Sequence, residues 1–233
     1  MEQSRYKSLF ELPNRILQVV AHPDDEIIYG GGTVALNQEI GGLSHIVCLS
    51  GSEADGPSRK AEFEASCKTL GVSYDLFKLP QGQFKRDHSV HKRLGAIIEE
   101  YKPTFIMTHS PYDFHSDHKD TREIAWQTAL NHQTSKHGIQ AFLFTEGYTP
   151  HMLPEVNALI DVGSVTSKVL NALESHQSQE KSLGHYKRTL KARWALRGVN
   201  ASCDEAEAFI LKPLPVSNFS IVPNYSKSER KQS

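Results

Sequence analysis

The sequence has little cysteine, little net charge and no long apolar run. Its three cysteines, Cys48, Cys67 and Cys203, are odd in number and show no C-x-x-C spacing, which argues against a disulfide framework and against a zinc site built on thiolates. A formal net charge of −1 over 233 residues gives no electrostatic basis for binding nucleic acid or a membrane surface. No run approaches the roughly 18 apolar residues of a membrane span, and the N-terminal residues contain no signal-peptide core. We therefore expect a cytoplasmic protein without a membrane span.

Strand-like and helix-like patterns alternate along most of the chain. Apolar, β-branched runs predict strands at 16–21, 44–49, 74–79, 104–108 and 141–145, and apolar stripes predict helices at 27–36, 59–70, 90–101 and 119–130. Beyond Gly147 the pattern loosens, with strands expected at 158–162 and 208–211 and helices at 164–175 and 186–196. This alternation predicts a single-domain, Rossmann-like α/β fold with a mainly parallel sheet and helices on both faces. We place the domain at residues 1–216 and expect the polar residues 217–233 to form a disordered tail.

A cluster of His, Asp and Glu follows the first predicted strand directly. The run 16–21 changes abruptly to His-Pro-Asp-Asp-Glu at 22–26, at the carboxyl end of a strand, where open α/β sheets place their ligands. Three carboxylates beside one imidazole repel one another unless a cation lies among them, and His plus Asp is ordinary zinc chemistry. The alternative is a solvated surface turn in which Asp25 caps the next helix. The glycines at 30–32 permit either close packing or close approach of a ligand.

A second cluster, Asp-Phe-His-Ser-Asp-His at 113–118, follows the strand-like run 105–108. Two strand ends that each carry His and Asp could converge on one ion. Zinc hydrolases use three protein ligands and leave the fourth position for water. His22, Asp25 and one histidine of the second cluster would meet that count.

These two clusters, together with four further motifs, resemble the LmbE-like/PIG-L family of zinc-dependent N-acetylsugar deacetylases. The motifs are A-H-P-D-D-E at 21–26, R-x-x-E at 59–62, a turn similar to the family's aspartate–glycine turn at 79–82, H-x-D-H at 115–118, H-x-S-Q at 176–179 and A-E-A-F at 206–209. Their order and spacing match together, which is far more specific than either cluster alone. The sequence departs from the family at Gln81, where members commonly carry Asp, and at Ser116, where many carry Pro.

The resemblance implies a zinc-dependent hydrolase that removes the acetyl group from an N-acetylglucosamine-type sugar or glycoconjugate. It implies one zinc ion per chain, in a site that other divalent metals could occupy, with His22, Asp25 and His118 as ligands and a zinc-bound water as nucleophile. Asp24 is then the expected general base, because a carboxylate within hydrogen-bond reach can take the proton of that water. The alternative role for Asp24 is that of a helix N-cap only.

His115 resembles the family's histidine that lies beside the metal ligands, and it would stabilise the oxyanion and protonate the leaving amine. Asp117 could hold His115 in the right tautomer or keep it protonated. The alternatives are a structural role for His115 and a helix-starting role for Asp117. Arg59 is either a sugar or phosphate contact or a solvated, ion-paired residue, and His176 is either a surface residue or a substrate contact. Seven other histidines lack ligand-like neighbours and are expected to be surface or packing residues: His45, His88, His91, His132, His137, His151 and His185.

The leading hypothesis is an enzyme whose partner is a small N-acetylated sugar or glycoconjugate, and the sequence leaves homo-oligomerisation open. A hydrolase of another amide could use the same zinc site. The rival from a different class is a non-catalytic sugar- or nucleotide-binding module that uses the glycines at 30–32. No G-x-G-x-x-G fingerprint follows the first strand. A relative that only binds should also have lost a ligand or the base, and none of these residues is missing.

Overall fold

The computed structural model describes residues 14–51, 56, 58–87, 89–133, 138–147 and 155–214. The strands are β1 (Arg15–Val20), β2 (Leu43–Cys48), β3 (Ser73–Leu76), β4 (Phe105–Thr108), β5 (Ala141–Thr145), β6 (Ala158–Asp161) and β7 (Ala206–Pro213). The helices are α1 (Asp25–Ile28), α2 (Gly31–Glu39), α3 (Arg59–Leu70), α4 (Ser89–Tyr101), α5 (Ser116–Gln133), α6 (Thr166–Leu173) and α7 (Glu180–Ala201). Short 3-10 turns cover Phe84–Arg86 and Gln177–Gln179.

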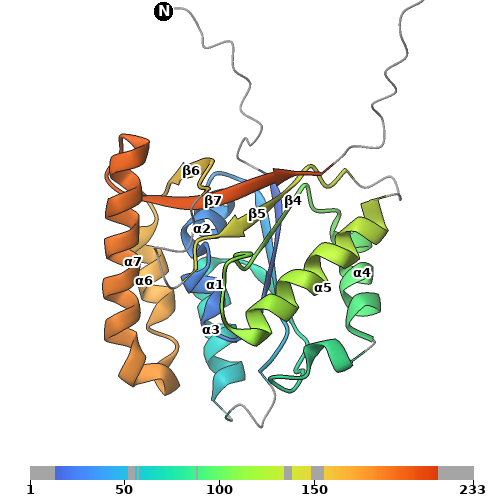
Figure 1. Ribbon diagram of the computed structural model, residues 1–233. Helices are drawn as coiled ribbons and strands as arrows, with labels where there is room; N and C mark the ends of the chain where they lie inside the picture. Colours follow the sequence, from blue (N-terminus) through green and yellow to red (C-terminus); the bar gives the residue numbers. More distant parts are fainter. Residues whose placement is uncertain are drawn as a thin grey trace, which may run out of the picture.

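All of these strands join one sheet in the order β3-β2-β1-β4-β5-β7-β6. Strands β1 to β5 pair in parallel, and β7 runs antiparallel to both of its neighbours. Helices α4 and α5 cover one face, and α2, α3, α6 and α7 cover the other (Figure 1). Alternate residues of β1 therefore enter different cores: Ile16 and Val20 pack on one face, and Leu17 and Val19 on the other. The predicted α/β fold class is confirmed.

The first predicted helix is divided in two at Gly30, which has a φ of 99°. A Cβ atom at this position would lie 2.6 Å from the Met107 sulfur on β4. The close approach of the two backbones therefore needs glycine, and the chain turns here between α1 and α2.

Several other element bounds differ from the prediction. The strand expected at 74–79 ends at Leu76 because Lys78 adopts a φ of 60°. Helix α5 begins at Ser116 rather than at residue 119, and α6 begins at Thr166 rather than at residue 164. Helix α7 covers 180–201, about twice the predicted 186–196. Residues 1–13 and 215–233, which include the predicted tail, lie outside the described residues.

Glu207 of β7 explains why glycines stand at 30–32. Its carboxylate accepts hydrogen bonds from the Gly32 and Thr33 backbone N–H groups, at 2.9 and 2.7 Å, and from the Thr33 hydroxyl. These groups form the N-terminus of α2, where backbone donors lack helical partners and a negative charge is favourable. A Cβ at Gly32 would stand 2.8 Å from Glu207 Oε1. The glycines thus serve close packing.

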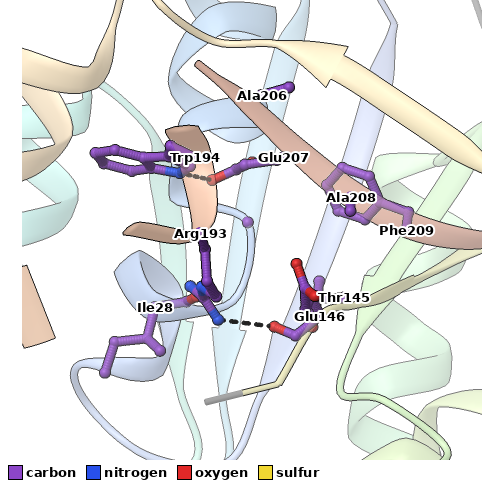
Figure 2. Close-up of a pocket in the computed structure, with 10 residues that line it drawn as sticks. Ile28, Thr145, Glu146, Arg193, Trp194, Ala206, Glu207, Ala208 and Phe209 are labelled. Carbon is purple, nitrogen blue, oxygen red and sulfur yellow. Dashed lines mark hydrogen bonds between the residues drawn. The ribbon is translucent and has the colours of Figure 1, made fainter. Parts of the chain in front are cut away.

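Trp194 and Arg193 of α7 complete this buried polar cluster (Figure 2). The Trp194 indole N–H donates to Glu207 Oε1 at 3.4 Å, and the Arg193 guanidinium donates to the carbonyls of Ile28, Glu146 and Gly147. The cavity between these side chains is only about 10 Å³, room for one water at most. The cluster therefore anchors α7 to the end of α1. Among the described helices, none has the length and apolar character needed to cross a membrane.

Glu207→Ala is expected to lower the free energy of unfolding by roughly 2–4 kcal/mol, because it leaves the buried donors of α2 without their charged acceptor. Chemical denaturation measures the loss. The matched control is Glu39→Ala, which removes an exposed carboxylate at the other end of the same helix and should change stability by no more than about 0.5 kcal/mol. Equal effects of the two substitutions would contradict the capping role of Glu207.

Candidate active site

The two His/Asp clusters lie together at the carboxyl edge of the sheet. Residues 22–26 follow β1 and residues 109–118 follow β4, and these two strands are hydrogen-bonded neighbours. From β1 the chain proceeds to β2 and β3 on one side, while β4 and β5 lie on the other. The clusters therefore meet at the topological switch point, where open α/β sheets bind ligands.

Three buried side chains from these clusters, His22, Asp25 and His118, point potential ligand atoms at one another. One donor atom from each lies within 4.8 Å of the other two. Asp25 Oδ2 is 3.3 Å from His22 Nδ1 and 3.4 Å from His118 Nε2. Burial would raise the pKa of Asp25, but the two imidazoles outweigh it and hold this pKa well below its usual range. The alternative of a solvated turn is wrong, because residues 22–26 are all buried.

The other nitrogen of each imidazole contacts a carboxylate. His22 Nε2 lies 3.1 Å from Asp117 Oδ2, and His118 Nδ1 lies 2.9 Å from Asp113 Oδ2. Each carboxylate favours a proton on the nitrogen it contacts, which leaves the inner nitrogen free to bind a metal. A set of one carboxylate and two imidazoles oriented in this way suits zinc. Burial would lower the pKa of His118, but Asp25 and Asp113 raise it to about 10. The two carboxylates therefore favour a positive charge at this position, which a proton supplies in the metal-free protein and a bound cation could supply instead.

Two further groups of side chains in the described part of the chain also meet the distance criterion for a metal. They are His22 with His115 and Asp117, and His109 with Asp113 and His118. Each contains one of the carboxylate–imidazole pairs just described. Each group also contains a histidine that is absent from the first set, either His115 or His109. Substitution of these histidines can therefore show which of the three groups binds the metal.

Asp24 adopts a φ of 105°, a conformation that side-chain-bearing residues rarely use. It occupies the N-cap position of α1, but its side chain makes no capping hydrogen bond within the described structure. The structure thus does not support a cap-only role. Burial raises the pKa of Asp24 to about 7, assisted by Asp25 and opposed by Arg59, whose Nη2 is 3.7 Å from Asp24 Oδ2. The carboxyl group is therefore set up to exchange protons near neutral pH.

Glu26 stabilises the backbone turn at Asp24. It is fully buried, and its carboxylate accepts hydrogen bonds from the Asp24 N–H at 2.8 Å and the Ser66 hydroxyl at 2.6 Å. His176 Nε2 lies 2.7 Å from Glu26 Oε1, across 150 residues of sequence. Both expectations for His176 are wrong, because this imidazole is 0% exposed and does not line the cleft. Burial would lower the pKa of His176, but Glu26 raises it.

The R-x-x-E and H-x-S-Q motifs interlock beside this network. Glu62 accepts hydrogen bonds from the Ser178 backbone N–H at 2.7 Å and from its hydroxyl at 2.6 Å. Arg59, one turn earlier on α3, is buried and donates to the Pro23 carbonyl. Its Nε has no partner among the described residues. Arg59 is therefore not solvated, and it lies close to Asp24 with a donor to spare.

His115 and Asp117 are not paired as expected. The Asp117 carboxylate contacts His22 and accepts the Gly82 N–H at 2.9 Å, whereas its backbone N–H donates to His115 Nδ1 at 3.2 Å. Burial and the nearby His118 lower the pKa of His115. The structure thus pairs the Asp117 carboxylate with His22 and not with His115. In the neutral imidazole the proton lies on Nε2, because Nδ1 accepts a hydrogen bond.

His109 was missed in the sequence. It follows the last residue of β4, its Nε2 accepts the Ala21 N–H at 3.0 Å, and its ring stacks on His118 with 4.1 Å between centroids. Burial holds the pKa of His109 well below the ordinary value, so it packs as a neutral ring. Its position directly after a strand was the signal in the sequence that could have identified it.

Tyr29 was also missed; its hydroxyl lies 3.1 Å from Asp113 and 3.2 Å from His118 Nδ1.

The site opens into a cleft of about 470 Å³, a volume in the range of small-molecule binding sites. Its lining residues are His22, Asp24, Asp25, Ile28, Tyr29, Arg59, Gln81, Asp113, Phe114, His115, His118, Gln179, Ser182 and Tyr186. The expected site residues His22, Asp24, Asp25, Arg59, His115 and His118 all line this cleft, whereas Asp117 and His176 do not. Asp117 is buried behind His22 and acts on the site through that imidazole.

The chain is similar to several proteins that are named as enzymes. The family described as PIG-L: GlcNAc-PI de-N-acetylase matches residues 17–129. Relatives include a 4-oxalmesaconate hydratase of Pseudomonas putida, 24% identical over 204 residues (76% of this chain, 78% of the relative), and a 1D-myo-inositol 2-acetamido-2-deoxy-alpha-D-glucopyranoside deacetylase of Actinosynnema mirum, 26% identical over 230 residues (72% and 81%).

Solved structures show the same fold. The N,N'-diacetylchitobiose deacetylase of Pyrococcus horikoshii superposes with a TM-score of 0.72 at 20% identity, over 90% of this chain and 87% of that one. The family match also contains both of the His/Asp clusters that form the site. Residues 17–129 therefore match the PIG-L family, and the similar proteins include deacetylases and a hydratase.

Proposed function

We propose that this protein is a zinc-dependent deacetylase that releases acetate from an N-acetylglucosamine-type sugar or glycoconjugate. The observation that carries the proposal is the buried convergence of His22, Asp25 and His118 with Asp24 beside them at the cleft. The family match and the deacetylase from Actinosynnema support the substrate class.

His22, Asp25 and His118 would hold the ion, one per chain. Their nitrogen and oxygen donors suit zinc, although other divalent ions accept the same donors. Zinc bound there would polarise the amide carbonyl and lower the pKa of a coordinated water to near 7.

The chain's own residues then move the protons. Asp24 accepts a proton from the attacking water as the new C–O bond forms, and returns it to the sugar nitrogen as the C–N bond breaks, which yields acetate and a free amine. His115 donates a hydrogen bond from Nε2 to the developing oxyanion, because its Nδ1 is already an acceptor. Asp117 positions the His22 ring. Arg59 lines the cleft and would contact a hydroxyl or an anionic group of the substrate.

A second candidate is the addition of water to a carbon–carbon double bond. The observation that favours it is the Pseudomonas relative, whose name describes a hydratase. Hydrolysis of another amide would need the same site. A binding module that uses the glycines at 30–32 is less well supported, because Glu207 and Met107 already fill the space next to them.

Acetate release distinguishes these candidates. The zinc-loaded protein should release acetate from at least one member of a panel of N-acetylated sugars and glycosides, and should contain about one zinc per chain. Chelation should abolish turnover, and added zinc should restore it. Hydration of 4-oxalmesaconate, followed as loss of the double bond, is the parallel assay. Hydration without any acetate release would overturn the deacetylase proposal.

A further inference from the structure

Phe114 stands at the rim of the cleft with 71% of its surface exposed. Most large apolar side chains of the described structure are buried, and this one instead lies between two residues of the site, Asp113 and His115. An exposed aromatic ring beside a binding site differs from scattered surface apolar residues, because a bound ligand could cover it.

The backbone on either side of Phe114 is held in place. Asp113 donates its N–H to the Ser110 carbonyl at 3.2 Å, and its Oδ1 accepts the His115 N–H at 2.9 Å. The other carboxylate oxygen of Asp113 contacts His118. Phe114 therefore projects from a fixed turn, and only its two side-chain torsion angles remain free to rotate. A rigid aromatic side chain binds a ligand face at low entropic cost.

The surroundings of the Phe114 ring leave it accessible to a ligand in the cleft. The Lys119 ammonium is 5.9 Å from the Phe114 ring centroid, near the outer limit of a cation–π contact, so it leaves much of the ring accessible. Tyr186 and Ser182 of α7 line the same cleft. The acetamido group of a substrate has to reach His22, Asp25 and His118, so the part that reaches the exposed rim is whatever is attached to the acetamido sugar.

We propose that Phe114 is a specificity-determining residue that packs against a ring attached to the acetamido sugar. The protein would then prefer ring-bearing glycosides of N-acetylglucosamine to the free monosaccharide. This inference rests on the proposed deacetylase function. The energy comes from stacking of the Phe114 ring on the C–H or π face of the attached ring.

The test compares phenyl N-acetylglucosaminides of both anomers with free N-acetylglucosamine. Phe114→Ala should lower the ratio of kcat/KM for the preferred glycoside to that for the free sugar by about three- to tenfold, mainly through KM. Phe114→Tyr should keep the wild-type ratio. Tyr74→Ala is the matched control, since Tyr74 is also an exposed aromatic residue and does not line the cleft; it should leave the ratio unchanged. An unchanged ratio in Phe114→Ala would overturn the proposal.

Calorimetry separates this inference from the proposed function. Phenyl glycoside is titrated into the zinc-loaded Asp24→Asn variant, with and without Phe114→Ala, so that no turnover occurs. Weaker binding by about three- to tenfold without the phenyl ring of Phe114 supports the stacking role, even if the wild type releases no acetate from any substrate. Equal binding, or no binding by either variant, overturns it. Acetate release by the wild type alone decides the deacetylase proposal.

Discussion

Asp24→Asn should lower kcat by about a hundredfold or more and should leave one equivalent of zinc bound. The amide has the shape of the carboxylate but cannot accept the proton of the attacking water. Asp24 is buried, lies beside Arg59, and is fixed by the hydrogen bond from its own N–H to Glu26. This backbone bond does not depend on the side chain, so the variant should keep the turn. Metal analysis and circular dichroism provide the controls. Turnover near that of the wild type would mean that another group takes the proton.

The pH dependence of the rate gives an independent check on Asp24. A base acts when ionised, so the rate should rise with pH through its pKa. Burial and the charge of Asp25 raise this pKa to about 7 in the metal-free protein, and the positive charge of a bound ion would lower it. The acid limb should therefore lie below about pH 7, and its midpoint reports the ionisations of the site as a whole. An unchanged acid limb in Asp24→Asn would assign the limb to another group.

The sheet could be predicted because its strands carry strong local signals. The run 16–21 is apolar except for Gln18, as expected for a strand buried on both faces, and the first four predicted strands each precede an apolar stripe of helical period. The bounds of the helices were harder to predict than the strands. Residues 180–185 at the start of α7 include Gly184, and sequence pattern alone does not favour a helix there. Packing of the later part of α7 on β7, through Trp194, stabilises the helix beyond its apolar stripe.

The meeting of the two His/Asp clusters could also be predicted, since the carboxyl ends of neighbouring parallel strands lie at one edge. The side chain that contacts the Asp117 carboxylate could not be predicted. His115 and Asp117 are two residues apart at the start of α5, and residues at that spacing do not face each other on a helix. Asp117 instead faces His22 from another strand end. Likewise, no local pattern connects His176 with Glu26, which only the tertiary fold brings together.

His118→Ala should abolish stoichiometric zinc binding and, with it, activity. The His118 Nε2 faces Asp25, and its other nitrogen is held by Asp113, so the imidazole is oriented for a ligand role that alanine cannot replace. Zinc content at a fixed free concentration, measured by mass spectrometry, gives the result directly. His22→Ala should behave in the same way, because its Nδ1 faces the same Asp25 oxygen.

Two matched histidine variants distinguish the three groups of possible ligands. His115→Ala should retain zinc, because Nδ1 of His115 accepts the Asp117 N–H and the residue lies outside the set of His22, Asp25 and His118. His109→Ala should also retain zinc, although loss of its stacking on His118 should weaken binding. Loss of zinc in His115→Ala with retention in His118→Ala would move the ion to His22, His115 and Asp117. Retention in both His22→Ala and His118→Ala would exclude every one of the three groups, since each contains one of these two histidines.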